Sequence, residues 1–450
     1  MLNINNKQDY SYLYNNCMNT SDEIIEKDDI TQKKYLSILD KVNSKLFPNL
    51  SLKVGLYNES LYCLKVQKKF FILTLIKILL RNSIIKCSIS GKPLLTFYTK
   101  NYRNDHDSYW NKIQQDSGEH DEITIMRESK FRIIFSNPFV FLEKLYWFSV
   151  ALVELKAIPN FIHRCYLAAQ MSCRKKTLER IKKFQLTPKV VMCFFDSSPD
   201  ECFVMQYFRN LGAITITNQH GQPVFHSFES DRLNQSQLFN FHCDYFFAKG
   251  PFLVEQFHKL GIENKIKIIG VVGYSYNDIQ LNVSKVFGVY LDTIGYNFAK
   301  KSNVDIINFA LNVAQETGYK FFIKIHPSDN ESNYYKYLGD HCINIYGSKE
   351  NLENSFSKAD FAIVHCSSTY LDAYLYGIRC FKFQSNIYFP IAYEDDVVSH
   401  PNELSCKIKQ WQCLDNSKKK EYISFIRNEY SSVFCAGKVK FTIEEILRNQ

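Results

Sequence analysis

The sequence predicts an α/β protein in which two doubly wound domains face each other across a cleft, with helical additions at both ends. From residue 188 onward, short apolar runs alternate with amphipathic stretches at the spacing of right-handed βαβ units. A polar stretch separates two such series, and 450 residues suit two domains better than one core. The expected division is a polar extension at 1–50, a first domain at 51–275 with a helical insertion, a linker at 276–285, a second domain at 286–400 and terminal helices at 401–450.

The first domain begins with predicted strands at 51–57 and 93–99, which flank a helix expected at 68–86. Residues 108–185 are expected to be mainly helical. The apolar run KVVMCFFD at 189–196 is typical of a strand buried on both faces of a parallel sheet. The remaining elements are strands at 213–221, 244–250 and 265–273, and helices at 201–212 and 251–261 that each end at a glycine.

The second domain repeats this alternation. Its predicted strands are at 285–292, 319–325, 343–347, 360–368 and 378–383, and its predicted helices are at 304–318, 351–359 and 369–377. Ligands of such doubly wound sheets bind beyond the carboxyl ends of the strands. The residues that follow each strand are therefore the candidates for function.

Composition narrows the class of protein. The formal net charge of +9 suits an anionic ligand, but the basic runs are too short for a nucleic-acid arm. The 14 cysteines form no CxxC pair and often lie in apolar runs, as expected of reduced, buried thiols in the cytoplasm. The N-terminus does not read as a secretory signal. No apolar segment offers about twenty uncharged residues, although a basic-flanked helix at 65–87 allows peripheral membrane attachment.

The first informative strand exit contains Asn218, Gln219, His220 and Gly221. The glycine permits a tight turn, which would present His220 to the cleft. A neutral imidazole there could take a proton from an acceptor hydroxyl. The alternative is a histidine that only hydrogen-bonds its own loop.

The second exit contains Lys324, His326 and Pro327. The proline blocks continuation of the strand and holds His326 at the sheet edge. From there the imidazole could donate to phosphate oxygens of a leaving group. Packing of His326 beneath the next loop is the alternative.

The third exit contains Ser367, Ser368 and Thr369, directly before a helix that carries Asp372. Hydroxyls and free backbone N–H groups at a helix start can bind an anion. Plain capping of the helix uses the same geometry. Asp372 could complement the helix dipole or hold Ser368.

Other polar segments are weaker candidates. The Asp-x-Asp pattern at 105–107 is interpreted as a surface loop, because no apolar strand precedes it. Asp196 could touch an acceptor, and the acidic run at 394–396 could bind a ribose or be solvated. GxGxxG, GxxxxGK[ST] and GxSxG patterns are missing, which disfavours dinucleotide-binding, P-loop and α/β-hydrolase enzymes.

Three segments together resemble the GT-B superfamily: QHG at 219–221, KIHP at 324–327 and AD-x5-CSST-x2-D-x4-G at 359–377. The most similar groups are the bacterial capsule and teichoic-acid polymerases, namely CDP-glycerol glycerophosphotransferase-like proteins and CMP-sialic acid or CMP-Kdo transferases. The resemblance covers about residues 188–385. It departs from those groups at Gln222, and an acidic base motif of the sialyltransferases is missing.

The resemblance implies two Rossmann-like domains, with the acceptor bound by the first and the nucleotide of the donor by the second. It places a catalytic histidine at His220 with Gly221, and phosphate contacts at His326 with Pro327 and at Ser367 with Ser368. The expected enzyme is a cytoplasmic glycosyltransferase that uses a CMP- or CDP-linked donor and a glycan or glycolipid acceptor. Attachment to the inner face of the membrane is left open. It needs no metal or other cofactor and binds no nucleic acid. A UDP-sugar 2-epimerase of the same fold and a non-catalytic polysaccharide assembly protein remain alternatives.

Overall fold

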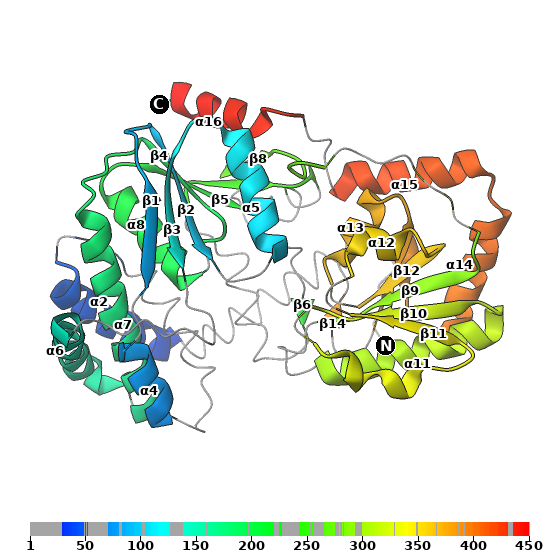
Figure 1. Ribbon diagram of the computed structural model, residues 1–450, viewed down its shortest axis with the longest axis horizontal. Coiled ribbons are helices and arrows are strands. Elements are labelled where there is room, and N and C mark those ends of the chain that lie inside the picture. The colour runs from blue at the N-terminus through cyan, green and yellow to red at the C-terminus, as the bar shows by residue number, and fades with distance from the viewer. Residues whose placement is uncertain are drawn as a thin grey trace.

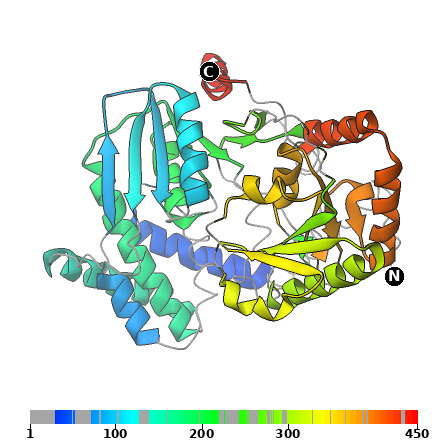
Figure 2. The same ribbon diagram turned by 45° about the vertical axis from the view of Figure 1, so that its right-hand side comes forward.

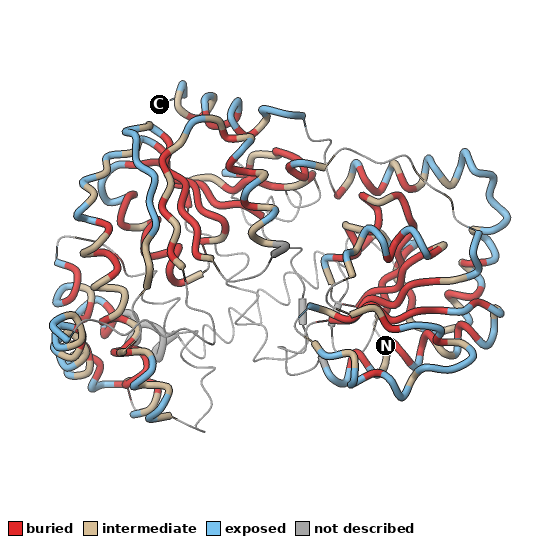
Figure 3. The backbone as a smooth tube through the Cα atoms, in the orientation of Figure 1, coloured by how far each residue is buried: buried red, intermediate tan, exposed pale blue. Residues whose placement is uncertain are grey.

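The computed structural model consists of two α/β halves, each built around a largely parallel sheet (Figure 1). The fold class predicted from the sequence is confirmed. The central strands of both sheets are buried, whereas edge strand β1 (Ile84–Ser88) is half-buried to exposed (Figure 3). The structure describes residues 29–48, 50, 52, 71–80, 83–100, 104–126, 138–158, 160–196, 198–219, 225–226, 243–251, 254, 265–274, 279, 281, 283–292, 299–327, 329–347, 350–365, 367–384, 388–389, 392–430 and 435–449.

The first sheet has the strand order β1-β3-β2-β4-β5-β7-β8, in which β1 is antiparallel to β3 and the other neighbours are parallel. Counted along the chain, its parallel strands follow the order 2-1-3-4-5-6, an extended form of one of the common doubly wound arrangements. Its strands are β1 (Ile84–Ser88), β2 (Leu94–Lys100), β3 (Asp121–Met126), β4 (Val190–Cys193), β5 (Ile214–Asn218), β7 (Tyr245–Ala248) and β8 (Ile266–Ile268).

Helices cover both faces of the first sheet. One face packs against α7 and α8, and the other packs against α5 together with the last helix of the chain, α16. The helices α2, α4, α6 and α7 group at one end of this half (Figures 1 and 2). Their bounds are α2 (Asp29–Leu46), α4 (Phe71–Leu80), α5 (Asn104–Ser117), α6 (Pro138–Glu154), η1 (Leu155–Ala157), α7 (Phe161–Lys182) and α8 (Pro199–Asn210).

The sequence analysis was wrong about two segments of this half. The helix predicted at 68–86 is α4, which ends at Leu80, and Ile84–Ser88 pairs as edge strand β1. The described part of 108–185 is mainly helical, as predicted, but it also contains strand β3, whose alternating buried and half-buried residues match one covered face and one open face. The Asp-x-Asp segment at 105–107 lies in helix α5 rather than in a loop.

In the first sheet the strand order reverses between β2 and β4, and a buried carboxylate bridges these two strands. Glu201 of α8 accepts a hydrogen bond from the backbone N–H of Thr99 in β2 (3.0 Å) and another from that of Phe195 after β4 (2.5 Å). Since β2 and β4 are the neighbours at which the strand order reverses, Glu201 fixes the two sides of the switch point together.

The second sheet is entirely parallel, with the order β11-β10-β9-β12-β13-β15. In chain order this is 3-2-1-4-5-6, the dinucleotide-fold arrangement, and its switch point lies between β9 and β12. The elements are β9 (Val286–Tyr290), α11 (Ala299–Thr317), β10 (Lys320–Lys324), η3 (Glu331–Asn333), η4 (Tyr335–Tyr337), β11 (Cys342–Tyr346), α12 (Leu352–Phe356), β12 (Phe361–Val364), α13 (Thr369–Leu375), β13 (Arg379–Phe383), η5 (Glu394–Asp396) and β15 (Val397–Val398).

Three helices end the chain, as predicted, but they do not stay together. The helices α14 (Pro401–Cys413) and α15 (Asn416–Tyr430) pack on opposite faces of the second sheet. The last helix, α16 (Lys438–Arg448), returns to the first half and packs against α5. Asp116 of α5 accepts hydrogen bonds from the backbone N–H groups of Gly437 (2.5 Å) and Val439 (2.8 Å).

The two halves also meet through a short sheet and a pair of tyrosines. Strand β6 (Phe225–His226) of the first half pairs antiparallel with β14 (Tyr388–Phe389) of the second. The hydroxyl of Tyr274, after β8, lies 3.0 Å from that of Tyr376 at the end of α13. Among the described helices, none is both long and apolar enough to cross a bilayer.

A buried carboxylate organises the second half. Asp396 is fully buried and accepts hydrogen bonds from the hydroxyls of Tyr370 (2.7 Å), Tyr374 and Tyr422 (2.8 Å) and from Nε of Arg379 (3.2 Å). The interpretation of this acidic run as solvated or ribose-binding is therefore wrong for Asp396. Its carboxylate joins α13, β13 and α15.

Replacing Asp396 by alanine should strongly destabilise the protein. The change leaves the guanidinium of Arg379 buried without its counter-ion, which typically costs about 3–5 kcal/mol of unfolding free energy. Tyr422→Phe removes the hydrogen bond from its hydroxyl to Asp396 (2.8 Å) and the one that this hydroxyl accepts from Arg379 (3.4 Å). It leaves the ion pair in place and should cost about 2 kcal/mol. Urea unfolding followed by tryptophan fluorescence would measure both, because Trp411 packs on Tyr422. Equal, small losses for the two variants would contradict the role given to Asp396.

Candidate functional site

The side-chain amides of Asn218 and Gln219 fix the chain where it leaves β5. Asn218 and Gln219 are buried. The side-chain N–H of Asn218 donates to the carbonyl of Cys193 at the end of β4 (2.8 Å), and the side-chain oxygen of Gln219 accepts from the backbone N–H of Lys249 after β7 (2.7 Å). These contacts fix the point from which the next loop leaves the sheet. His220 and Gly221, the predicted catalytic histidine and its glycine, lie outside the described residues.

Lys249 is a candidate that the sequence analysis missed. It follows β7, and its ammonium nitrogen lies 4.7 Å from the ring centre of Tyr109 in α5. It forms no salt bridge with any residue in the described part of the chain. Burial lowers the pKa of this lysine, while the negative charge of Asp372 on α13 acts in the opposite direction. Lys249, on the first half, is thus under the electrostatic influence of Asp372, which lies on the helix of the third predicted motif.

The exit of β10 places Lys324 and His326, two of its predicted phosphate-binding residues, differently. Lys324 is buried, and its ammonium donates to the carbonyls of Ile325 (3.1 Å) and Gly347 (2.9 Å). Burial lowers its pKa. His326 is half-buried and Pro327 is exposed, in a turn closed by a hydrogen bond from the N–H of Asp329 to the carbonyl of His326 (2.9 Å). Lys324 therefore ties β10 to the end of β11, and His326 is the more accessible residue of the motif.

The exit of β12 shows which hydroxyl caps the helix. The hydroxyl of Ser367 donates to that of Thr369 (2.7 Å) and accepts from the backbone N–H of Thr369 (3.2 Å). Ser368 immediately precedes α13 but forms no side-chain capping bond, and it is exposed. Capping is therefore done by Ser367, and the hydroxyl of Ser368 faces solvent.

A histidine–aspartate pair lies at the switch point of the second sheet. Nδ1 of His365, after β12, lies 2.9 Å from a carboxylate oxygen of Asp292, after β9, and both side chains are buried. The side-chain oxygen of Asn303 in α11 accepts from the backbone N–H of Asp292 (3.0 Å). The sequence places both residues at strand ends, but only the strand order shows that these ends are neighbours.

The remaining candidates of the first half take part in internal contacts. The carboxylate of Asp107 accepts from the hydroxyl of Tyr98 (2.7 Å) and pairs with Lys100 (3.1 Å). Asp196 is buried and accepts from the backbone N–H of Cys243 (2.9 Å). Within the described residues, no group of three or more histidines, cysteines or acidic residues is arranged to hold a metal ion.

Comparison with known proteins gives a limited picture. No protein-family profile matches the chain, and neither does any protein with a curated description. Among solved structures, the UDP-GlcNAc 2-epimerase from Methanocaldococcus jannaschii shows 14% identity over 79% of this chain and 99% of its own, with a TM-score of 0.45. The UDP-GlcNAc 2-epimerase from Neisseria meningitidis bound to UDP-GlcNAc shows 12% identity over 79% and 100%, with a TM-score of 0.47.

The wall teichoic acid polymerase TagF is also similar, with 14% identity over 61% of this chain and 85% of its own and a TM-score of 0.34. All three similarities are weak in sequence and in superposition. The fold class of the chain is therefore established by its own strand orders.

The pair at the switch point should matter for stability. Asp292→Ala removes the contact between two buried side chains, Asp292 and His365, and should lower the unfolding free energy by about 2–4 kcal/mol. Asp292→Asn keeps an acceptor oxygen and should cost less than half as much. Thermal or urea unfolding of the two variants would measure the difference. If alanine and asparagine were equally harmless, the two strand ends would not depend on this contact.

Proposed function

We propose that this protein is a GT-B-type glycosyltransferase, or a polyol-phosphate transferase, that builds a bacterial surface polysaccharide from a CMP- or CDP-activated donor. The second half would bind the nucleotide and phosphate of the donor, and the first half would bind a glycan or glycolipid acceptor. Capsule, O-antigen and teichoic-acid-like polymers are the product classes. The enzyme would act in the cytoplasm, at the inner face of the membrane.

One observation carries this proposal: two predicted phosphate-binding motifs leave the same edge of the second sheet on either side of β9, the strand that borders the switch point. The last residues of β10 and β12, Lys324 and Val364, are both in register with Tyr290 at the end of β9. His326 and Ser367 therefore start from the same edge, separated by one strand, or about 10 Å. This is where doubly wound sheets bind the phosphates of nucleotides.

The phosphate would be held by neutral donors and one cation. His326 and Ser368 are accessible and can each donate to a phosphate oxygen. Ser367 and Thr369 are bonded to each other and would shape the loop rather than supply most of the binding. Lys249, with no ion pair among the described residues, would add its positive charge from the first half when the two halves enclose the donor.

In the reaction, the acceptor oxygen forms a bond to the transferred group while the bond from that group to the leaving nucleotide breaks. For a CMP-sugar the bond broken is from sugar carbon to phosphate oxygen, and for a CDP-polyol it is from phosphorus to the bridging oxygen. In both cases CMP leaves with additional negative charge, which His326 and the donors around it would stabilise. His220 would accept the proton of the acceptor hydroxyl. These residues supply the charge and proton steps without a bound metal.

Nucleotide binding tests the proposal directly. Thermal unfolding of the purified protein would be followed with CMP, CDP, UDP, UDP-GlcNAc, GDP and ADP. A ligand that binds only the folded state at 100 times its Kd stabilises by about 2.7 kcal/mol. We expect an increase in Tm with CMP or CDP that His326→Ala removes. Stabilisation by UDP-GlcNAc alone, with turnover in the absence of any acceptor, would instead support a 2-epimerase. No increase with any nucleotide would overturn the proposal.

Lys249→Met should weaken the stabilisation by CMP or CDP, because the variant removes the cation while keeping much of the side-chain volume. We expect about a tenfold loss of affinity, the value of one charge-assisted hydrogen bond. Lys112→Met is the matched control: Lys112 is half-buried like Lys249, but it lies over Tyr274 at 4.6 Å and donates to the carbonyl of Gly273 (3.4 Å). Equal effects of the two substitutions would mean that only general charge matters.

A further inference from the structure

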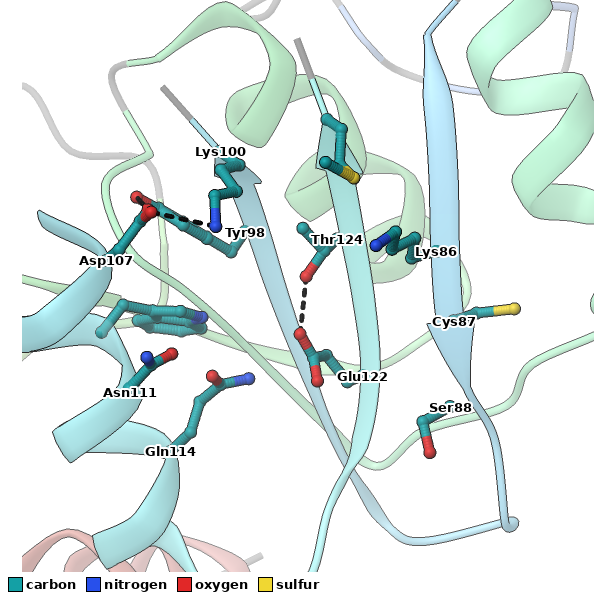
Figure 4. A pocket seen from close by; sticks show the side chains of 12 residues that line it. Lys86, Cys87, Ser88, Tyr98, Lys100, Asp107, Asn111, Gln114, Glu122 and Thr124 are labelled. Atoms are coloured by element: carbon teal, nitrogen blue, oxygen red, sulfur yellow. Dashed lines mark hydrogen bonds and ion pairs between the residues drawn. The ribbon is translucent and has the colours of Figure 1, made fainter. Parts of the chain in front are cut away.

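The first half contains a pocket of about 300 Å³ that the proposed reaction does not use. Its floor is the face of the sheet formed by β1, β3 and β2, and helix α5 forms one wall (Figure 4). The volume is at the lower end of the range for small-molecule sites, which is about 300–1,000 Å³. A ligand of one or two sugar rings fits this size class.

Strand register explains why this face is polar. Lys86, Thr124 and Tyr98 lie in one row across β1, β3 and β2, and Ser88 and Glu122 lie in the next row. On β3 the opposite face carries Ile123 and Ile125, which are buried in the core. The polar row is left half-open, so that its side chains point into the hollow (Figure 4).

Several polar atoms of the lining have no partner within the described part of the protein. One oxygen of Glu122 accepts from the hydroxyl of Thr124 (2.6 Å), which leaves the second oxygen available. The amide nitrogen of Gln114 donates to Thr96 (2.9 Å), which leaves its oxygen available. Trp110 is 1% exposed, and its indole N–H has no hydrogen-bond partner. Both acceptors and a donor therefore line the same hollow.

The charges of the pocket favour a neutral ligand. Asp107 is paired with Lys100 and also accepts from Tyr98, so these two charges compensate each other. The other two charged side chains of the lining, those of Lys86 and Glu122, carry opposite charges. A phosphate or a nucleotide would meet as much negative as positive charge. A hydroxyl group, which donates and accepts at once, suits alternating donors and acceptors.

Helix α5 separates this pocket from the boundary between the two halves. Asp107, Trp110 and Gln114 face the pocket, whereas Tyr109 contacts Lys249 on the other side of the helix. The pocket is therefore distinct from the candidate active site. One end of the pocket is lined by Lys100, the last residue of β2, and so reaches the carboxyl edge of the first sheet.

We infer that this pocket binds a neutral polyhydroxylated ligand, one or two sugar units, through Glu122, Gln114 and Trp110. In a role that rests on the proposed transferase function, it would hold a sugar unit of the acceptor glycan at a distance from the reacting end. A polysaccharide held at two places would stay bound between successive additions, because the second contact becomes intramolecular.

Saturation-transfer NMR on the full-length protein tests this inference without any nucleotide. The probes are glucose, galactose, N-acetylglucosamine, maltose and chitobiose, with CMP and inorganic phosphate as anionic comparisons. We expect transfer to at least one sugar in the unmodified protein and about a tenfold loss of affinity in Glu122→Gln or Gln114→Leu. The control is Glu119→Gln, at an exposed carboxylate next to the same strand that does not line the pocket.

Unchanged Tm values would show that the variants are folded. No transfer to any of the sugars, a signal that Glu122→Gln leaves intact, or displacement of the sugar by inorganic phosphate would each overturn the inference. The result is separable from the proposed function. Sugar binding without stabilisation by nucleotides would refute only the transferase, and nucleotide binding without sugar binding would refute only the pocket.

Discussion

The buried carboxylate of Asp396 is the contact on which the second half of the molecule depends. Helix α13 has only seven residues, too few to be stable alone. Its Tyr370 and Tyr374 bind Asp396, and the guanidinium of Arg427 donates to its last carbonyls, those of Tyr374 (2.5 Å) and Leu375 (3.0 Å). The third motif precedes α13, and Asp372 lies on it. The position of the candidate phosphate site is thus set by a charge that lies behind it and does not take part in it.

The two halves solve the same problem at their switch points. Where the strand order reverses, the crossovers to left and right diverge and leave a crevice between two neighbouring strands. In the first half, Glu201 spans that crevice with two hydrogen bonds from backbone N–H groups. In the second, Asp292 and His365 span it with one contact between side chains. In each half a buried acidic residue therefore fixes the strand ends on both sides of the crevice.

The sequence predicts the central strands well because they are buried on both faces. Short continuous apolar runs such as KVVMCFFD and DFAIVHCSS are typical of such strands. The prediction fails at the margin of the first sheet. Strand β3 begins with two acidic residues, Asp121 and Glu122, so that the apolar alternation of a half-covered strand is confined to its last four residues. Helix α5 contains few apolar residues and shows no strong period. The three motifs were predicted from their local pattern. Lys249 and Asp292 were not identified as candidates, and Asp396 was named only within an acidic run expected to bind a ribose or be solvated. The partners of these three residues are 123, 73 and at most 26 residues away in sequence, and only the folded chain brings them together.

The return of α16 to the first half has a mechanical consequence. The polypeptide crosses from one half to the other before β9 and crosses back after α15, so the halves are joined by two covalent connections. A domain joined by a single connection can rotate about it. Two separated connections resist such a twist and leave a hinge motion, about the line that joins them, as the least restricted movement. The two connections therefore favour hinge opening and closing of the two halves over rotation of one half against the other. Asp116 fixes one of these connections where it enters α16.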